Sequence, residues 1–291
     1  MILIFFLILI FIFFLILLFS LLYCVLYLCL YLLCHLIPFR QTRTRAKQKL
    51  LGIYRNLCTV CGFLLRLRLN VTVTCDQNTA PLSRDNIYIM IANHQSWFDI
   101  LLITCFIHPD TSLIKFVMKQ ELLWQLPFAS WFCYLNGFPI LKRKSDEKSR
   151  HHDLSAITAA CKSMCDTPGT LMSFPEGTRF STKKKQAKQS PFQSLLPPKP
   201  KGLSLSIEAM HTHLAGVIDL TIIYHHQRAS IGDFLLGRMR DVDLHYQLLS
   251  NEQLCLQGNK NLNEHKPEFA AWLNNLWCQK DQAIREHRTA S

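Results

Sequence analysis

The first 37 residues form an apolar stretch that constrains this chain more than any other feature of its sequence. Only Ser20, several tyrosines and His35 interrupt the stretch, and Pro38 ends it. A helix needs roughly 20 apolar residues to cross a bilayer, so the stretch is long enough to serve as an anchor. Basic residues are frequent in residues 40–49, and such residues stay on the cytoplasmic side. We therefore expect a membrane protein with a single N-terminal anchor and its remaining residues on the cytoplasmic side, at the inner membrane if the source is bacterial.

Two other interpretations of residues 1–37 are a cleaved signal peptide and a membrane hairpin. A cleaved signal peptide fits less well, because no charge precedes the apolar run, the run is too long, and no small-residue cleavage site follows it. A hairpin that dips into one leaflet would place the rest of the chain on the same side as a spanning helix. The sequence leaves open whether residues 1–37 span the bilayer or enter one leaflet.

The chain is strongly basic, with a formal net charge of +12 and a pI near 9.2. A basic protein suits an anionic partner, either phospholipid head groups or nucleic acid. The anchor favours an anionic membrane surface, and no finger spacing or basic motif interleaved with aromatics indicates nucleic acid. The lysine run at residues 183–188 either adds to membrane attraction or is a solvated loop.

Twelve cysteines are scattered along the chain, several of them inside the apolar stretch. Cys58 and Cys61 have CxxC spacing, but no second pair and no nearby histidine completes a zinc site. Reduced cytoplasmic thiols are the simpler explanation, and we expect no metal site.

Alternating strand and helix patterns after residue 70 predict an α/β fold with a mostly parallel central sheet flanked by helices. In such sheets ligands bind outside the carboxyl ends of the strands. We expect residues 1–70 to form the anchor and a helix on the membrane surface or in the core, and residues 71–291 to form the catalytic domain. Strands are predicted at 70–75, 87–92, 113–118, 138–141, 170–174 and 217–224, helices at 50–69, 96–107, 120–134, 149–165 and 203–213, and an irregular excursion at 186–201.

The end of the second predicted strand carries a histidine that is able to act as a base. His94 lies in the run Ala92-Asn93-His94-Gln95-Ser96-Trp97-Phe98-Asp99, where the strand gives way to a helix. An imidazole takes a proton from an alcohol near neutral pH if a carboxylate fixes its tautomer, and Asp99 is placed to do so. Ser96 is an alternative nucleophile, although its side chain should turn away along the helix.

Two further runs carry an arginine at or just after the end of a predicted strand. Phe174-Pro175-Glu176-Gly177-Thr178-Arg179 combines a glycine, which permits close backbone approach, with an arginine that is able to bind phosphate in a fork. The alternative is a β-turn with a surface ion pair. Gly137-Phe138-Pro139-Ile140-Leu141-Lys142-Arg143 also ends in an arginine at a strand end.

The NHxxxxD block at residues 93–99, the GxxxLxR-like block at residues 137–143 and the FPEGTR block stand in the order found in a known family. The chain resembles the PlsC-like 1-acylglycerol-3-phosphate acyltransferases, also called lysophospholipid acyltransferases. Most members have a proline where this chain has Asp219, and this departure resembles the branch that contains the bacterial YihG-type enzymes and certain eukaryotic relatives. The departure leaves the preferred lysolipid open.

The resemblance implies transfer of a fatty acyl group from acyl-CoA or acyl carrier protein to the sn-2 hydroxyl of lysophosphatidic acid, giving phosphatidic acid, with no cofactor. It implies that His94 is the general base and Asp99 its orienting carboxylate. The alternatives are an acyltransferase for another lysophospholipid head group, a lipid hydrolase or thioesterase, and a non-enzymatic membrane scaffold. The sequence has no GxSxG nucleophile elbow, which a hydrolase of that type would carry. Acyl-chain preference and oligomeric state are not predicted. The substrate contacts implied by the resemblance are Asn93, Arg143, Glu176, Gly177, Thr178 and Arg179.

Overall fold

The structure is a computed structural model in which most of the chain after residue 40 is described. Nearly all of the predicted anchor lies outside the described residues. The described residues are 18, 22, 25–26, 29, 40–77, 79–107, 111, 113–120, 133–134, 136–141, 155, 157–162, 164–165, 169–226, 230–250, 253–254 and 266–289.

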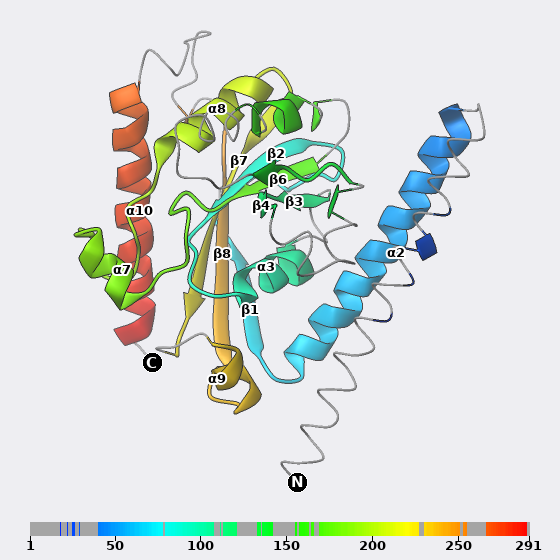
Figure 1. The fold of residues 1–291 in the computed structure, drawn as a ribbon. Helices are drawn as coiled ribbons and strands as arrows, with labels where there is room; N and C mark the ends of the chain where they lie inside the picture. Colours follow the sequence, from blue (N-terminus) through cyan, green and yellow to red (C-terminus); the bar gives the residue numbers. More distant parts are fainter. Residues whose placement is uncertain are drawn as a thin grey trace.

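A six-stranded sheet forms the centre of the described structure (Figure 1). Its strands follow the order β1 (Asn70–Cys75), β8 (Asp241–Leu249), β7 (Leu214–Tyr224), β2 (Ile87–Ala92), β6 (Gly169–Ser173) and β3 (Ile114–Phe116). Neighbouring strands are parallel except β7 and β8, which are antiparallel. A separate two-stranded sheet pairs β4 (Met118–Lys119) with β5 (Ile140–Leu141). The predicted α/β class and mostly parallel sheet are confirmed.

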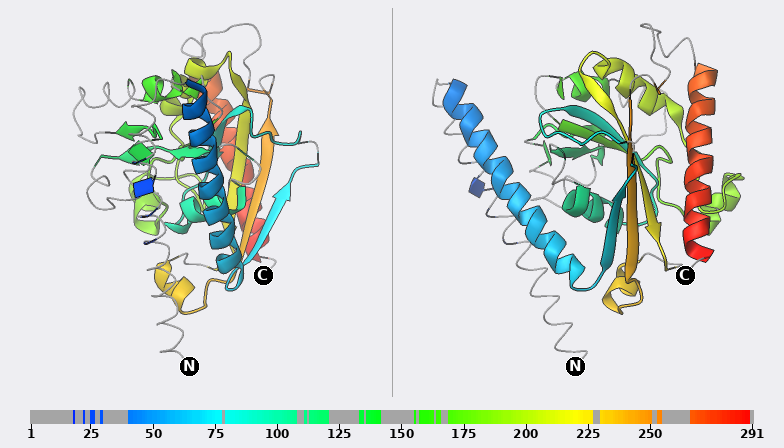
Figure 2. Two further views of the ribbon diagram at one scale, coloured as in Figure 1. Left: turned by 90° about the vertical axis from the view of Figure 1, so that its right-hand side faces the viewer. Right: turned by 180° about the vertical axis from the view of Figure 1, so that it is seen from behind.

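Helices cover both faces of the sheet, as the views in Figure 1 and Figure 2 show for α2 and α10. On one side lie α2 (Arg40–Arg66), α3 (Phe98–Leu102) and the π-helix η1 (Ile103–Ile107). On the other side lie α8 (Pro200–Met210) and α10 (Lys266–Thr289). The short helices α7 (Thr182–Ala187) and α9 (Ile231–Leu235) belong to connections between the larger elements.

The central strand β2 explains why the sheet has two cores. All six of its residues are buried, because helices cover both of its faces. Successive side chains of a strand point to opposite faces. Tyr88 and Met90 accordingly pack in the core on the α2 and α3 side, whereas Ile89 and Ile91 pack in the core on the α8 and α10 side.

Helix α2 begins earlier than the predicted helix at 50–69, and it packs on the sheet through one face. Its predicted position on a membrane surface stays a prediction. Cys61 and Leu65 are buried against the sheet, while Val60, Phe63 and Leu67 are more than half exposed. None of the helices in the described part of the chain is long and apolar enough to cross a bilayer. The predicted anchor at residues 1–37 lies almost wholly outside that part and stays a prediction.

Strand β8 and helix α10 were not predicted, and α10 explains the unusual Asp219. Lys280 of α10 is 2% exposed, and its Nζ lies 2.6 Å from Asp219 Oδ1. The same ammonium donates to Leu220 O at 2.7 Å and to Thr221 Oγ1 at 3.1 Å. A buried charge requires a partner, so Asp219 on β7 and Lys280 on α10 stabilise each other and fix the helix against the sheet.

Candidate active site

Two of the three polar runs leave the sheet side by side. Strand β2 ends before Asn93 and strand β6 ends before Phe174, and the two strands pair in parallel with Ile91 opposite Ser173. Both runs therefore start at the same edge of the sheet, as the alternation of strands and helices predicted. The backbone N–H of Phe180 donates to His94 O at 2.7 Å, which joins the second run to the first.

His94 and Asp99 form the predicted pair. His94 Nδ1 lies 2.7 Å from Asp99 Oδ2, and Asp99 is completely buried whereas the His94 side chain is 16% exposed. A carboxylate accepts only, so it holds the proton on Nδ1 and leaves Nε2 as the basic nitrogen. The His94 ring stacks on Phe174 at a centroid distance of 4.0 Å, which fixes its plane. The arrangement presents a base with a defined tautomer.

Asp99 is itself held by three more donors. The backbone N–H groups of Gln95 and Ser96 donate to its Oδ2 at 2.7 and 2.9 Å, because the chain turns into α3 at this point. The hydroxyl of Tyr224, at the end of β7, donates to its Oδ1 at 2.6 Å. Burial, followed by the charge of Asp99, raises the pKa of Tyr224, so the phenol stays protonated and donates. Tyr224 was missed from the sequence, where only its place at the end of an apolar strand marks it.

The FPEGTR run forms a tight turn on top of a buried carboxyl group. Gly177 N donates to Phe174 O at 2.9 Å, and Gly177 has a φ of +67°. A residue with a side chain would be strained in this backbone conformation. Glu176 is completely buried; its Oε1 accepts from His94 N at 3.1 Å and its Oε2 from Leu196 N at 3.0 Å. The β-turn alternative is thus correct for the backbone, but the surface ion pair weighed with it is wrong.

Burial controls the charge of Glu176. Desolvation raises its pKa to about 8, against the opposing effect of the two backbone donors. The carboxyl group is therefore largely protonated at neutral pH.

Asn93 links two strands. Its Nδ2 donates to Ile222 O at 2.9 Å, and Ile222 N donates to its Oδ1 at 2.8 Å. The side chain thus continues the pairing of β2 with β7 beyond the last residue of β2. Asn93, like Glu176, is completely buried, so neither side chain is accessible to a substrate.

Basic side chains surround the turn. The Arg179 guanidinium lies over the ring of Trp97 at 4.2 Å, and Trp97 is 53% exposed. Lys184 Nζ donates to Thr178 Oγ1 at 2.7 Å and to Arg179 O at 3.0 Å. The Lys199 side chain lies beside Gly177. Positive charge is therefore concentrated around the turn, where an anionic group would be attracted.

The predictions for Arg143 and for Ser96 have different outcomes. Arg143 lies outside the described residues, so its predicted phosphate contact stays a prediction. Ser96 is 3% exposed and its Oγ accepts from Phe98 N at 3.2 Å, which occupies the hydroxyl inside the turn. This placement opposes a nucleophilic role for Ser96.

Comparisons with known proteins find related sequences. A family model described as Acyltransferase matches residues 70–225. The mouse 1-acyl-sn-glycerol-3-phosphate acyltransferase epsilon is 24% identical over 230 residues, which cover 71% of this chain and 59% of that protein. The 1-acyl-sn-glycerol-3-phosphate acyltransferase of Saccharomyces cerevisiae is 32% identical over 118 residues, which cover 40% of this chain and 35% of that protein. The chain thus matches less than two thirds of the length of either relative.

A solved structure has the same fold. The crystal structure of the 1-acyl-sn-glycerophosphate (LPA) acyltransferase PlsC from Thermotoga maritima aligns with a TM-score of 0.54 at 16% identity, over 94% of both chains. At this identity the likeness shows the fold alone.

The raised pKa of Glu176 predicts a pH-dependent stability. The folded protein keeps a proton on Glu176 up to about pH 8, whereas the unfolded chain releases it above about pH 4.5. The contribution of this carboxyl to folding therefore falls as pH rises through that window. Glu176→Gln has no proton to release, so its free energy of unfolding, relative to that of the original protein, should rise between pH 5 and pH 8. Denaturant unfolding at several pH values measures this difference.

Glu286→Gln, at an exposed position of α10, serves as the matched control and should give a difference that does not change with pH. A constant difference for Glu176→Gln as well would show that Glu176 is ionised in the folded protein.

Proposed function

Because this chain belongs to the acyltransferase family, we propose that it transfers a fatty acyl group from an acyl thioester to the sn-2 hydroxyl of lysophosphatidic acid. The observation that carries the proposal is the His94–Asp99 pair at the sheet edge, with Nε2 left as the basic nitrogen. The acceptor is the one in the names of the mouse and yeast relatives. The acyl donor is acyl-CoA or acyl carrier protein.

The reaction is a direct transfer. His94 Nε2 takes the proton of the acceptor hydroxyl as its oxygen attacks the thioester carbonyl, and the C–S bond then breaks. The thiolate leaves and receives the proton from the imidazolium, so the base returns to its starting state. Asp99 stabilises the imidazolium while it exists, as in other histidine–carboxylate pairs. The occupied position of Ser96 supports a mechanism without a covalent acyl-enzyme.

The anionic head group binds to the basic turn. Arg179 offers a planar fork that matches phosphate, and Trp97 holds that fork in place. Gly177 and Thr178 shape the same turn beside it. Glu176 and Asn93, which resemblance to the family placed among the substrate contacts, have a supporting function in this proposal because both are completely buried.

The catalytic domain works at the membrane surface. Val60 and Phe63 on α2 and Leu67 just after it are 56%, 64% and 65% exposed, and the sequence of the first turns of α2 is rich in arginine and lysine. Apolar side chains beside basic ones are typical of a helix that lies in the head-group region. Residues 1–37 supply the anchor, and the domain lies on the cytoplasmic side. Membership of the YihG-type branch stays a prediction, for which Asp219 is the argument.

His94→Ala should lower acyl transfer by about 10²- to 10⁴-fold, the usual effect of removing a positioned general base. Asp99→Asn should lower it by nearly as much, because the amide no longer fixes the tautomer. The measurement is mass spectrometry of the products formed from acyl-CoA and several lysophospholipids by purified protein in detergent. His211→Ala, at an exposed histidine after α8, is the control and should keep full activity.

Activity of the original level in a well-folded His94→Ala protein would rule out the mechanism. Products from a different lysolipid, with none from lysophosphatidic acid, would instead correct the acceptor and keep the mechanism. Absence of product from every lysolipid, in the original protein, would favour a non-enzymatic scaffold.

Arg179→Lys should raise the KM for lysophosphatidic acid by about tenfold, since an ammonium can neither form both hydrogen bonds of the fork nor stack on Trp97 in the same plane. The KM for acyl-CoA should change much less. Steady-state kinetics with each substrate varied in turn separate the two constants. Lys183→Ala, at an exposed position of α7, is the control. An effect confined to the KM for acyl-CoA would assign Arg179 to the donor instead.

Removal of residues 1–37 should make membrane attachment sensitive to salt. The remaining basic residues at 40–49 are still attracted to anionic lipid, but this attraction is screened, since the Debye length falls from about 10 Å at 0.1 M salt to about 3 Å at 1 M. Burial of the apolar anchor is not screened. In membrane flotation, 1 M salt should therefore release the truncated protein, which stays bound at 0.1 M salt, whereas the full chain should stay bound at both concentrations. Release of the full chain by salt would contradict the anchor.

A further inference from the structure

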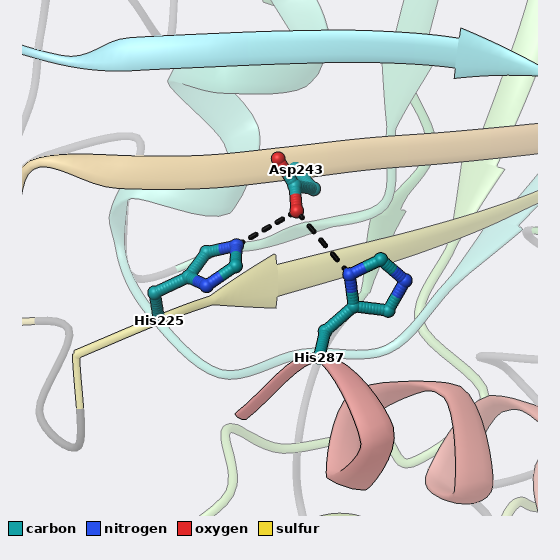
Figure 3. A group of neighbouring side chains, drawn as sticks. All are labelled: His225, Asp243 and His287. Carbon is teal, nitrogen blue, oxygen red and sulfur yellow. Dashed lines mark hydrogen bonds and ion pairs between the residues drawn. The ribbon is translucent and has the colours of Figure 1, made fainter. Parts of the chain in front are cut away.

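Two histidines and an aspartate meet on the face of the sheet opposite the catalytic pair (Figure 3). His225 follows the last residue of β7, Asp243 lies near the start of β8, and His287 lies in the last turns of α10. His225 Nε2 lies 2.7 Å from Asp243 Oδ2, and His287 Nδ1 lies 3.6 Å from the same oxygen. Three separate elements thus bring one potential metal ligand each to a single point.

The spacing of these atoms fits a tetrahedral metal ion. The three ligand atoms all lie within 4.8 Å of one another. Around a zinc ion with bonds of about 2.0 Å, neighbouring ligand atoms are about 3.3 Å apart. The separations of 2.7 and 3.6 Å lie on either side of that value. The two histidine nitrogens, at most 4.8 Å apart, approach each other on binding.

The types of the three ligand atoms favour one class of metal ion. Two imidazoles and one carboxylate suit zinc and its neighbours among the divalent transition metals, whereas magnesium and calcium prefer oxygen ligands alone. The His225 and Asp243 side chains are each 21% exposed and that of His287 is 53% exposed, so an ion has access from solvent. Water is then the fourth ligand.

We infer that His225 Nε2, Asp243 Oδ2 and His287 Nδ1 bind a divalent transition-metal ion, with zinc as the preferred one. The site is separate from the chemistry, because Tyr224 points to Asp99 on one face of β7 while His225, the next residue, meets α10 on the other. The ion ties the last turns of α10 to the ends of β7 and β8. Its effect is on the stability of this edge of the sheet.

Zinc binding to the full chain, purified in detergent and treated with a chelator, tests the inference. Titration calorimetry with zinc alone, and metal analysis after dialysis, should show one tightly bound equivalent. The midpoint of thermal unfolding should rise on adding zinc, because the ion binds the folded state. His225→Ala, Asp243→Asn and His287→Ala should each weaken the affinity by on the order of 100-fold or more, since loss of an outer-shell partner alone typically costs 10- to 100-fold.

The matched control is His211→Ala, which removes an exposed histidine before the start of β7 and should leave zinc binding unchanged. Cobalt(II) distinguishes this site from the cysteines, because thiolate ligands give a sulfur-to-metal charge-transfer absorption that two histidines and an aspartate do not give. His287 is more than half exposed, so His287→Ala should fold even if the other two variants do not.

Equal zinc affinity in His287→Ala and the original protein, a thiolate spectrum for the bound cobalt, or no tight binding at all would each overturn the inference. In the last case the three side chains form only an ion-pair network. None of these readouts measures acyl transfer, so they are independent of the proposed function.

Discussion

A carboxylate that is completely shielded from water must have its charge balanced inside the protein, and Asp99 meets this demand with donors from two distant parts of the chain. The imidazole of His94, two backbone N–H groups at the start of α3 and the hydroxyl of Tyr224 all point to its two oxygens. Because all four donors bind the same carboxylate, the position of each depends on the positions of the others. The tautomer of the proposed base therefore depends on β2, α3 and β7 being in place together, and the catalytic geometry is a property of the sheet edge as a whole.

A second buried carboxyl group extends this support away from the base. Glu176 joins the backbone of His94 to that of Leu196, within the segment predicted as an irregular excursion. That segment is in turn held by α10, where Asp281 accepts from the N–H groups of Gln193 at 3.0 Å and Ser194 at 2.7 Å. Helix α10 is thus connected to the backbone of His94 through a short series of hydrogen bonds. Because backbone donors left unpaired in a buried position are costly, each of these carboxyl groups fixes a loop that lacks regular structure.

The sequence was most informative where one local signal was sufficient. An apolar strand followed directly by a polar run marks the end of a strand, and this placed His94 and the turn at Gly177 correctly. It was least informative where pairing depends on distant residues. Tyr224 lies 125 residues from Asp99, and Lys280 pairs with Asp219 across two elements of which one was not predicted. The charge of Glu176 could not be predicted either, because a glutamate in a turn is normally exposed, and it is chiefly burial that raises its pKa.

The single antiparallel pair in the sheet has consequences at both faces of β7. In this arrangement Tyr224, at the carboxyl end of β7, pairs with Val242 at the start of β8. If β8 ran parallel to β7, the carboxyl end of β8 would lie there instead, and Asp243 would lie near the opposite edge of the sheet. The reversal therefore brings the carboxylate of Asp243 to His225, one residue beyond the tyrosine that holds Asp99. Since neighbouring residues of a strand point to opposite faces, an ion bound there would restrain the backbone of β7 at the point where Tyr224 supports the His94–Asp99 pair, without contacting that pair.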